Sequence, residues 1–268
     1  MSDDTGSGPG IGLALSAPEE KRTTVEKRPK VRWHHASADL TDFAMVSWAA
    51  DPDRVAARLP DGFEPDVREG VTLVSLVAFR DHRFHFRFAR QIRLTAGQVN
   101  YRTYVRHKGR TGVWFFGTSL ASRLVHLPAT AWKMPWHHET VDVQAAWEDE
   151  KVRTWRLHAD GRWGAAAVTL RGTGRPAPPP AGFATADEVS RILTDPALGW
   201  YDRRDGTGTG CYSVWHEPLT LEGADVESAH SQVFTDLGLV SAGQAPCHVG
   251  LQRRSVFDIH TPPRRQAP

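Results

Sequence analysis

The hydrophobic residues of this chain recur mostly at every second position or in short unbroken runs, which is the pattern of β-strands. Residues 98–106 alternate between apolar and polar side chains, and residues 71–79 form the nearly continuous apolar run expected of a strand buried on both faces. A polar turn at 107–110 and the apolar residues 113–116 predict that the first of these strands returns as a hairpin. Other strands are predicted at 43–49, 139–147, 152–158, 162–171, 200–201, 211–212 and about 248–259.

Helical signals are fewer and short. Asp51 followed by Pro52 is typical of a helix N-cap and first helical position, and Ser119 or Ser122 is expected to cap a second helix. Further helices are predicted at about 185–193 and 226–237. Many strands, few helices and no β–α alternation favour a mainly β (α+β) protein whose antiparallel sheet closes into a β-barrel or cone.

The two ends of the chain lack the large apolar residues of the middle. Residues 1–30 are rich in Gly, Ser, Pro, Glu and Lys. They can bury too little apolar surface to offset the conformational entropy lost on ordering. We therefore expect a disordered leader at 1–30, a single domain at 31–260 and a disordered tail at 261–268. A chain of 268 residues is long for one domain but within the range of β-rich ones.

Composition narrows the partners and the compartment. The formal net charge of +2 is too small to indicate a nucleic acid or an acidic membrane as partner. Cys211 and Cys247 are too few for a disulfide framework, and the 13 histidines form neither an HExxH motif nor a tight histidine–carboxylate spacing. No metal and no other cofactor is therefore predicted. With no signal peptide and no apolar run long enough to span a bilayer, the chain is expected to be cytoplasmic.

One stretch leaves a nucleic-acid interpretation open. Residues 83–90 interleave basic and aromatic side chains, a pattern that single-stranded nucleic-acid binders use. The same pattern is typical of an amphipathic strand or a pocket lid, and the small net charge favours that structural interpretation.

Several blocks of the sequence match a known family. The central blocks are Val-Asn-Tyr-Arg-Thr-Tyr-Val at 99–105, Gly-Val-Trp-Phe-Phe at 112–116, Ala-Ser-Arg-Leu at 121–124 and Met-Pro-Trp-His at 134–137. The flanking blocks are 51–64, which ends in Leu-Pro-Asp-Gly-Phe-Glu, and Trp-His-Glu-Pro-Leu at 215–219. Over roughly 39–257 the chain resembles the YqjF-like family of unknown function, which is grouped with the acetoacetate decarboxylases.

The resemblance implies a β-barrel or cone that encloses a pocket for a small keto or carboxylic acid. In the decarboxylases a Gly-aromatic-Pro-Lys-Lys segment supplies an imine-forming lysine and a second lysine that lowers the pKa of the first. Here Trp136 and His137 occupy the two lysine positions, and an amide, Gln98 or Asn100, replaces the acid of the preceding strand. Lys133 lies three residues too early to be the same lysine, so imine-based decarboxylation is not carried over.

Two candidate catalytic residues lie in or beside this segment. His137 is predicted to act as general acid or base near neutral pH, with Trp136 lining the pocket. The alternative is an ordinary strand-start residue, and because His137 and His138 point to opposite faces of a strand, at most one enters a pocket. Lys133 is the second candidate, able to form an imine if desolvated, although lysines at helix ends more often bind carbonyls or solvent.

The predicted strand at 98–106 supplies the candidate ligand-binding face. Its polar side chains at alternating positions are Gln98, Asn100, Arg102 and Tyr104. Arg102 is suited to hold a carboxylate through two parallel hydrogen bonds, and Trp114 is expected to line the same pocket. The alternative is the solvent face of an edge strand, which the apolar run at 71–79 argues against because it provides a neighbouring strand.

These observations predict a small-molecule pocket protein for a keto or carboxylic acid, an enzyme of acid–base type without the Schiff-base lysine, with a place in secondary metabolism. A non-catalytic ligand-binding protein is the alternative that the missing lysine pair supports. The expected partner is a small molecule, with neither nucleic acid nor membrane, and homo-oligomer formation is left open.

Overall fold

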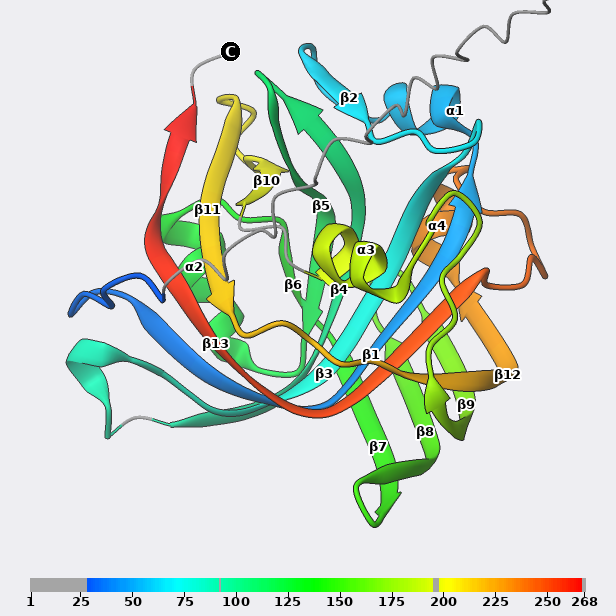
Figure 1. Ribbon diagram of the computed structural model, residues 1–268. Coiled ribbons are helices and arrows are strands. Elements are labelled where there is room, and N and C mark those ends of the chain that lie inside the picture. The colour runs from blue at the N-terminus through cyan, green and yellow to red at the C-terminus, as the bar shows by residue number, and fades with distance from the viewer. Residues whose placement is uncertain (1–27, 92, 195–197, 267–268) are drawn as a thin grey trace, which may run out of the picture.

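The structure, a computed structural model, describes residues 28–91, 93–194 and 198–266. Within them, 7 strands close into a barrel in the order β1-β3-β4-β5-β10-β11-β13, because β13 also pairs with β1 (Figure 1). Their bounds are β1 Ala36–Ala50, β3 Thr72–Phe86, β4 Leu94–His107, β5 Arg110–Leu120, β10 Leu198–Asp202, β11 Thr209–His216 and β13 His248–Gln266. Neighbouring barrel strands are antiparallel except β5 and β10, which run parallel.

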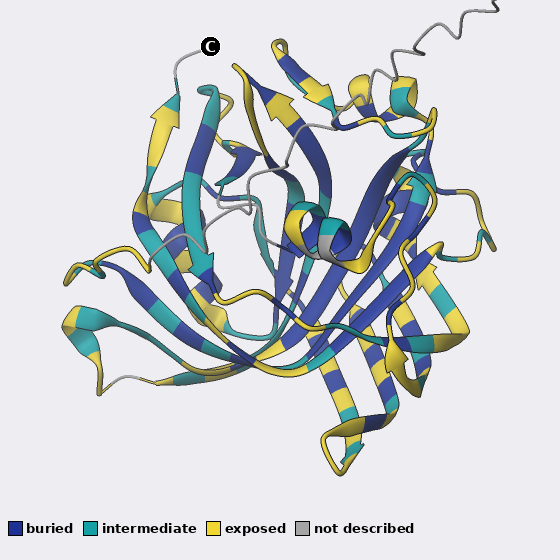
Figure 2. Ribbon diagram, in the orientation of Figure 1, coloured by how far each residue is buried: buried dark blue, intermediate teal, exposed yellow. Residues whose placement is uncertain are grey.

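The sheet continues past β13 into an outer layer that covers one face of the barrel. This layer consists of β12 (Glu222–Ser231), β9 (Ala166–Pro176), β8 (Lys151–Asp160) and β7 (Thr140–Glu148). An apolar core lies between the two layers, where Val46 and Leu76 of the barrel pack with Trp155 and Leu170 of the outer layer. Figure 2 shows buried and exposed residues alternating along β7 and β8, so the outer layer has one face in solvent.

A second apolar core lies inside the barrel. Leu40, Phe43 and Val77 belong to it. Leu40 and Phe43 face the same side although they are three residues apart, because the pairing of β1 with β3 shifts between Thr41 and Ala44. Such a bulge changes which residues of a strand face inward and bends the strand.

The remaining elements are short. They are α1 Pro52–Ala56, β2 Phe63–Pro65, η1 Arg87–Ala89, η2 Arg123–Val125, α2 His126–Ala131, β6 Trp136–His138, α3 Ala186–Val189, the π-helical η3 Ser190–Thr194 and α4 Gln232–Asp236. The side chain of Asp51 accepts a hydrogen bond from the Asp53 backbone at 2.9 Å, so the N-cap predicted for α1 is confirmed. Val189 of α3 and Leu193 of η3 pack into the inner core, which places this segment across one end of the barrel (Figure 1).

Most sequence expectations for the fold are confirmed, and two at the C-terminal side are wrong. The mainly β barrel and the hairpin of β4 and β5 are present. Residues 226–231 continue β12 instead of beginning a helix, and only Gln232–Asp236 is helical. Residues 261–266 belong to β13, and 264–266 pair with β11, instead of forming a disordered tail. Most of the predicted leader at 1–30 lies outside the described residues.

None of the described helices combines the length and the apolar character needed to cross a bilayer.

Candidate functional site

The polar face of β4 lines the interior of the barrel. Strand β4 pairs with β3 on one side and β5 on the other, so the edge-strand alternative is wrong. Val99 and Tyr101 face outward into the core between the layers, whereas Tyr104 belongs to the inner core. Because side chains alternate along a strand, the inward side chains of β4 are Gln98, Asn100, Arg102 and Tyr104.

Two amides in the middle of this face form a short hydrogen-bonded ladder. The Asn100 carbonyl oxygen accepts from Gln98 Nε2 at 3.0 Å and from Thr118 Oγ1 of β5 at 2.8 Å. Among the described residues, no hydrogen bond occupies the Asn100 amide nitrogen or the Gln98 carbonyl oxygen. Both side chains are half-buried. The ladder therefore presents one free donor group and one free acceptor to the barrel interior.

Arg102 is an inward cation without a counterion among the described residues. One of its terminal nitrogens donates to the Leu193 carbonyl of η3 at 2.8 Å, and the guanidinium carbon lies 5.6 Å from the centre of the Tyr104 ring. Its Nε is buried and has no hydrogen-bond partner. Arg102 takes part in none of the ion pairs among the described residues. Because a buried donor without an acceptor is costly, this geometry favours binding of an anion at Nε.

Tyr104 is held by a chain of hydroxyl groups. Its hydroxyl lies 2.9 Å from Ser75 Oγ of β3, which in turn lies 2.7 Å from Ser47 Oγ of β1. All three side chains are buried. This chain fixes the Tyr104 ring, which lies beside the Arg102 guanidinium.

An aromatic wall continues from the β4 face around the barrel, beginning on β5 where Phe115 pairs with Arg102. Phe115 of β5 stacks on Tyr212 of β11 with ring centres 5.7 Å apart, and Tyr201 of β10 lies 6.3 Å from Tyr212. Burial raises the pKa of Tyr201 to about 12 and raises that of Tyr212 as well, so both hydroxyls are neutral at physiological pH. Phe115 and Tyr212 keep intermediate exposure, which shows that other side chains do not fully cover this wall.

The side chains of Trp136 and His137 lie on opposite faces of β6. Strand β6 runs parallel to β5, with Trp136 paired to Thr118 and His137 to Ser119. Trp136 therefore shares the inward face with Thr118. His137 faces the outer layer, where its ring stacks on Trp163 at 4.6 Å, and burial lowers its pKa. His137 is not brought together with the polar face of β4.

The outward side of β6 contains a buried carboxylate that the sequence analysis missed. Glu139 accepts a hydrogen bond from Ser119 Oγ at 2.5 Å and one from the Trp163 backbone at 2.7 Å. Glu139 and Ser119 are both buried. Since both carboxylate oxygens have donors, this group holds β5, β6 and the loop after β8 together.

Trp114 lies apart from the β4 face, and Lys133 lies in the turn after α2. Lys133 follows α2 in the left-handed region with φ 56, and its carbonyl accepts from the Arg204 backbone at 2.9 Å. Trp114 packs on Phe63 with ring centres 4.9 Å apart, in a cluster with Trp200 on the outside of the barrel. The candidate residues that the structure does bring to the interior are Gln98, Asn100, Arg102, Tyr104 and Trp136.

Asp81 is an inward acid that the sequence analysis did not single out. It pairs with Leu40 of β1 and Ala96 of β4, and antiparallel partners point to the same face, so it shares the side of the inner core with Leu40. Only 8% of Asp81 is exposed, and the described residues give it no hydrogen bond or ion pair. The apolar run that identifies β3 ends at Phe79, and the Arg-Asp-His sequence that follows looks like solvent-exposed strand.

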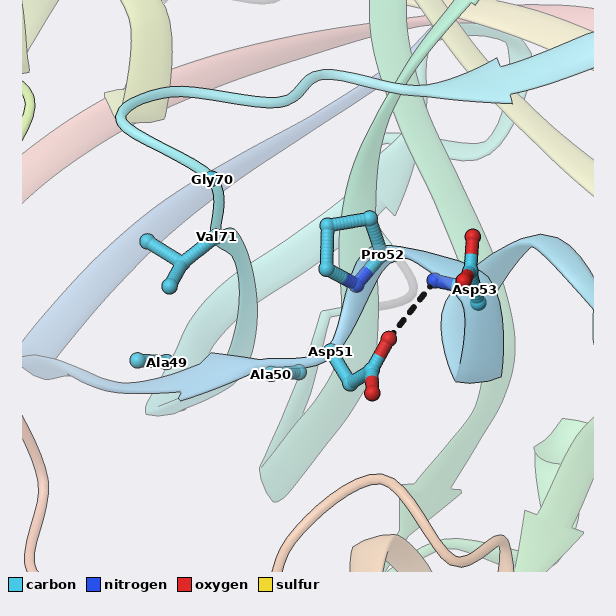
Figure 3. A pocket seen from close by; sticks show the side chains of 7 residues that line it. All are labelled: Ala49, Ala50, Asp51, Pro52, Asp53, Gly70 and Val71. Atoms are coloured by element: carbon cyan, nitrogen blue, oxygen red, sulfur yellow. Dashed lines mark hydrogen bonds between the residues drawn. The ribbon is translucent and has the colours of Figure 1, made fainter.

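The surface also carries an open hollow of about 520 Å³ at the barrel rim (Figure 3). It is lined by Ala49, Ala50, Asp51, Pro52, Asp53, Gly70 and Val71. The Asp51 carboxylate in this hollow is engaged in capping α1. The hollow contains none of the candidate residues.

A group of side chains suited to hold a metal ion is not found among the described residues. The inward face instead combines one cation, two amides, several hydroxyls and aromatic rings. That donor set suits an organic anion.

These features define a closed β-barrel whose interior combines an apolar core with a polar face on β4. The comparisons give its family. The chain belongs to the DUF2071 family, described as an uncharacterized conserved protein, whose model matches residues 37–253. The resemblance drawn from the sequence is thereby confirmed. No curated protein matches the chain.

Several solved structures share the fold. An acetoacetate decarboxylase-like enzyme from Sphingomonas wittichii RW1 has a TM-score of 0.59 at 10% identity, covering 87% of this chain and 94% of that one. The enduracididine biosynthesis enzyme MppR complexed with pyruvate has a TM-score of 0.58 at 13% identity, covering 96% and 98%. An acetoacetate decarboxylase from Legionella pneumophila has a TM-score of 0.56 at 14% identity, covering 89% and 91%. At these identities the likeness shows an acetoacetate decarboxylase-like fold.

Proposed function

We propose that the barrel is a binding site for a small carboxylic or keto acid, with Arg102 as the carboxylate anchor. The observation that carries the proposal is the buried, unpartnered Nε of Arg102. An incoming carboxylate that accepts from Nε and from one terminal nitrogen forms two parallel charge-assisted hydrogen bonds. The aromatic wall of Phe115 and Tyr212 offers an apolar surface to the rest of the ligand.

The ligand class is supported from a second direction. One protein with this fold is described as complexed with pyruvate, which is a small keto acid. A shared fold does not transfer a ligand, so the argument depends on Arg102 and on the free amide groups of Gln98 and Asn100. These amides are placed to bind a carbonyl or hydroxyl group next to the carboxylate.

Turnover at this site, where it occurs, is proposed to proceed without an imine. The two positions that hold lysines in the decarboxylases are Trp136 and His137 here. Lys133, the lysine nearest to these positions in the sequence, follows α2, and its backbone carbonyl accepts from the Arg204 backbone. An enzyme of acid–base type and a non-catalytic binder therefore share the same proposed pocket, and both require Arg102.

Calorimetric titration with pyruvate and with longer 2-keto acids measures the affinity for these ligands and tests the proposal. Arg102→Leu is expected to weaken binding about 10- to 100-fold, since a hydrogen bond to a charged group contributes about 1.5–3 kcal/mol. Arg102→Lys keeps the charge but not the planar fork, so an intermediate loss is expected.

Arg80→Leu is the matched control, because Arg80 is a half-exposed arginine near Asp42 on the outer face of β3. It should bind the acids as the unmodified protein does. Equal affinity of the Arg102→Leu and Arg80→Leu proteins, or no binding of any keto acid to the unmodified protein, contradicts the proposal.

A further inference from the structure

Asp81 is the feature of the barrel that the proposed acid site leaves unexplained. Asp81 as a residue is only 8% exposed and its side chain faces the interior, yet the described residues offer it no donor. The paired residues on either side, Leu40 and Ala96, are apolar. Burial raises the pKa of this carboxyl to about 7, and no neighbouring charge contributes to the shift.

The arginine and aspartate side chains beside Asp81 on β3 and β1 face outward. On its own strand, Arg80 faces outward near Asp42. On β1, Asp39 faces outward and pairs with Arg83 and Arg254.

The strands on the other sides add no charge to the interior at this level. On β4 the inward neighbours are Leu94, Ala96 and Gln98. Beyond Leu40, β13 presents the hydroxyl of Ser255, which pairs with Leu40 in the sheet. None of these paired residues therefore presents a charge to the carboxyl.

Arg102 lies too far away to neutralise Asp81. Arg102 pairs with Ser75, and Asp81 is six residues further along β3. At about 3.3 Å per residue the two backbone positions are separated by roughly 20 Å. The barrel interior thus has a cationic pole near η3 and an acidic pole at the other end of the β4 face.

The surroundings of the acidic pole are apolar and partly open. Phe79 belongs to the inner core and Phe84 packs against it. Phe84, Ala96 and Gln98 keep intermediate exposure, so solvent reaches this part of the inner face. A carboxylate at the base of an apolar, aromatic surface matches an alkyl or aryl ammonium ion, which supplies both a cation and an apolar body.

We propose that Asp81 forms a second subsite of the barrel, which binds the ammonium group of a small primary amine with an apolar body. The subsite rests on the proposed function only in that both ligands enter the same barrel. Binding the cation requires the ionised carboxylate, so complex formation displaces a proton from Asp81 when the pH is below 7. The proton leaves to the buffer, and no covalent bond is made or broken.

The probe is n-butylammonium, with 1-butanol as its uncharged counterpart. Titration calorimetry at pH 6 in two buffers of different ionisation enthalpy measures proton release. With the carboxyl pKa at about 7, release of close to one proton per bound amine is expected at pH 6, and about a tenth of one at pH 8. The affinity is expected to be roughly tenfold higher at pH 8 than at pH 6, and 1-butanol is expected not to bind.

Variants separate this subsite from the acid site. Asp81→Asn should lose both amine binding and the released proton, whereas Asp39→Asn, a carboxylate on the outer face of β1, should lose neither. Arg102→Leu should keep amine binding while it loses pyruvate binding. If Asp81→Asn does not fold, proton release by the unmodified protein remains the deciding measurement.

Three results overturn the subsite. They are absence of amine binding to the unmodified protein, amine binding without proton release at pH 6, and equal affinities for the amine and the alcohol. Failure of pyruvate to bind while the amine binds with proton release overturns the acid site and leaves this subsite standing.

Discussion

At the residue scale, the barrel interior differs from the rest of the molecule in how its charges are partnered. Elsewhere, buried carboxylates have donors: Asp258 accepts from Arg28 and Ser37, and Glu139 has a donor on each oxygen. Inside the barrel, Arg102 and Asp81 lack charged partners among the described residues. Since an unpaired buried charge destabilises a fold, the two exceptions indicate groups kept for binding.

The pH dependence of stability provides a test of the burial of Asp81. The folded protein keeps the Asp81 proton up to a pKa of about 7, whereas the unfolded chain loses it near the ordinary value of 3.8. Between these values the folded state binds more protons, so stability falls as the pH rises from about 4 to about 7. Asp81→Asn removes this loss, and its stability relative to the unmodified protein should rise by up to about 4 kcal/mol over that range.

Urea denaturation of both proteins at pH 5 and pH 8 measures the effect. The quantity compared is the change in the free energy of unfolding between the two pH values. Histidines such as His137 and His248 contribute equally to this change in both proteins, so their contribution cancels. Asp39→Asn is again the control, since that carboxylate lies on the outer face of the sheet with arginine partners. The same pH dependence in the Asp81→Asn and unmodified proteins would show that Asp81 is hydrated, not buried.

At the element scale, the sequence predicts the face of a side chain only where that face is determined within one strand. The alternation in 98–106 predicts which residues of β4 share a face, and Gln98 does share the inward face with Arg102 in the structure. The position of His137 is not local, because it follows from the parallel pairing of β6 with β5. No pattern within 133–138 specifies that pairing, so the sequence could not tell which residue of the segment enters the barrel.

The segment α3–η3 closes the end of the barrel next to Arg102, and one side chain holds its start. Glu188 accepts from the Ala184 backbone at 2.8 Å and from Arg68 at 2.8 Å, while its own backbone donates to Thr185 Oγ1 at 3.1 Å. Thr185 and Glu188 thus form a capping arrangement at the helix start. The hydrogen bond from the Ala184 backbone is the largest influence that lowers the pKa of Glu188.

Glu188→Ala is expected to loosen this segment without unfolding the barrel. Loss of the cap should cost about 1 kcal/mol, and hydrogen exchange of the amides in 186–194 should accelerate by several-fold. Glu227→Ala removes a comparable exposed ion pair with Arg171 on the outer layer and serves as control. Unchanged exchange in 186–194 would mean that the inner-core contacts of Val189 and Leu193 alone hold the segment.

At the scale of the whole molecule, closure of the barrel depends on the long final strand. Strand β13 pairs with β1, β11 and β12, so one segment joins the barrel seam to the outer layer. The strand predicted from the sequence ends too early because Pro262 and Pro263 resemble a disordered tail. Both prolines lie where the pairing with β11 shifts between Cys211 and Ser213, and proline is tolerated at such a bulge because no ladder hydrogen bond is lost there.

Truncation after Thr261 tests whether the end of β13 is an integral part of the barrel. The described residues removed are those that pair with Thr209, Gly210 and Cys211 of β11, together with the Arg265 hydrogen bond to the Thr207 carbonyl. We expect a loss of about 1–2 kcal/mol, seen as a fall of roughly 2–8 °C in Tm.

The truncation should also uncover the buried Cys211 thiol, whose pKa is raised by burial. In a Cys247→Ser background, labelling by a thiol reagent should therefore be several-fold faster than in the full-length chain. Truncation after Gln266 is the control, because it keeps every described pair between β13 and β11. Equal Tm values and equal labelling rates for the two truncated proteins would mean that the part of β11 at Thr209–Cys211 is held by β10 alone. The barrel seam would then end at the pairing of Ser213 with His260, and the final residues would be a surface extension that the fold does not need.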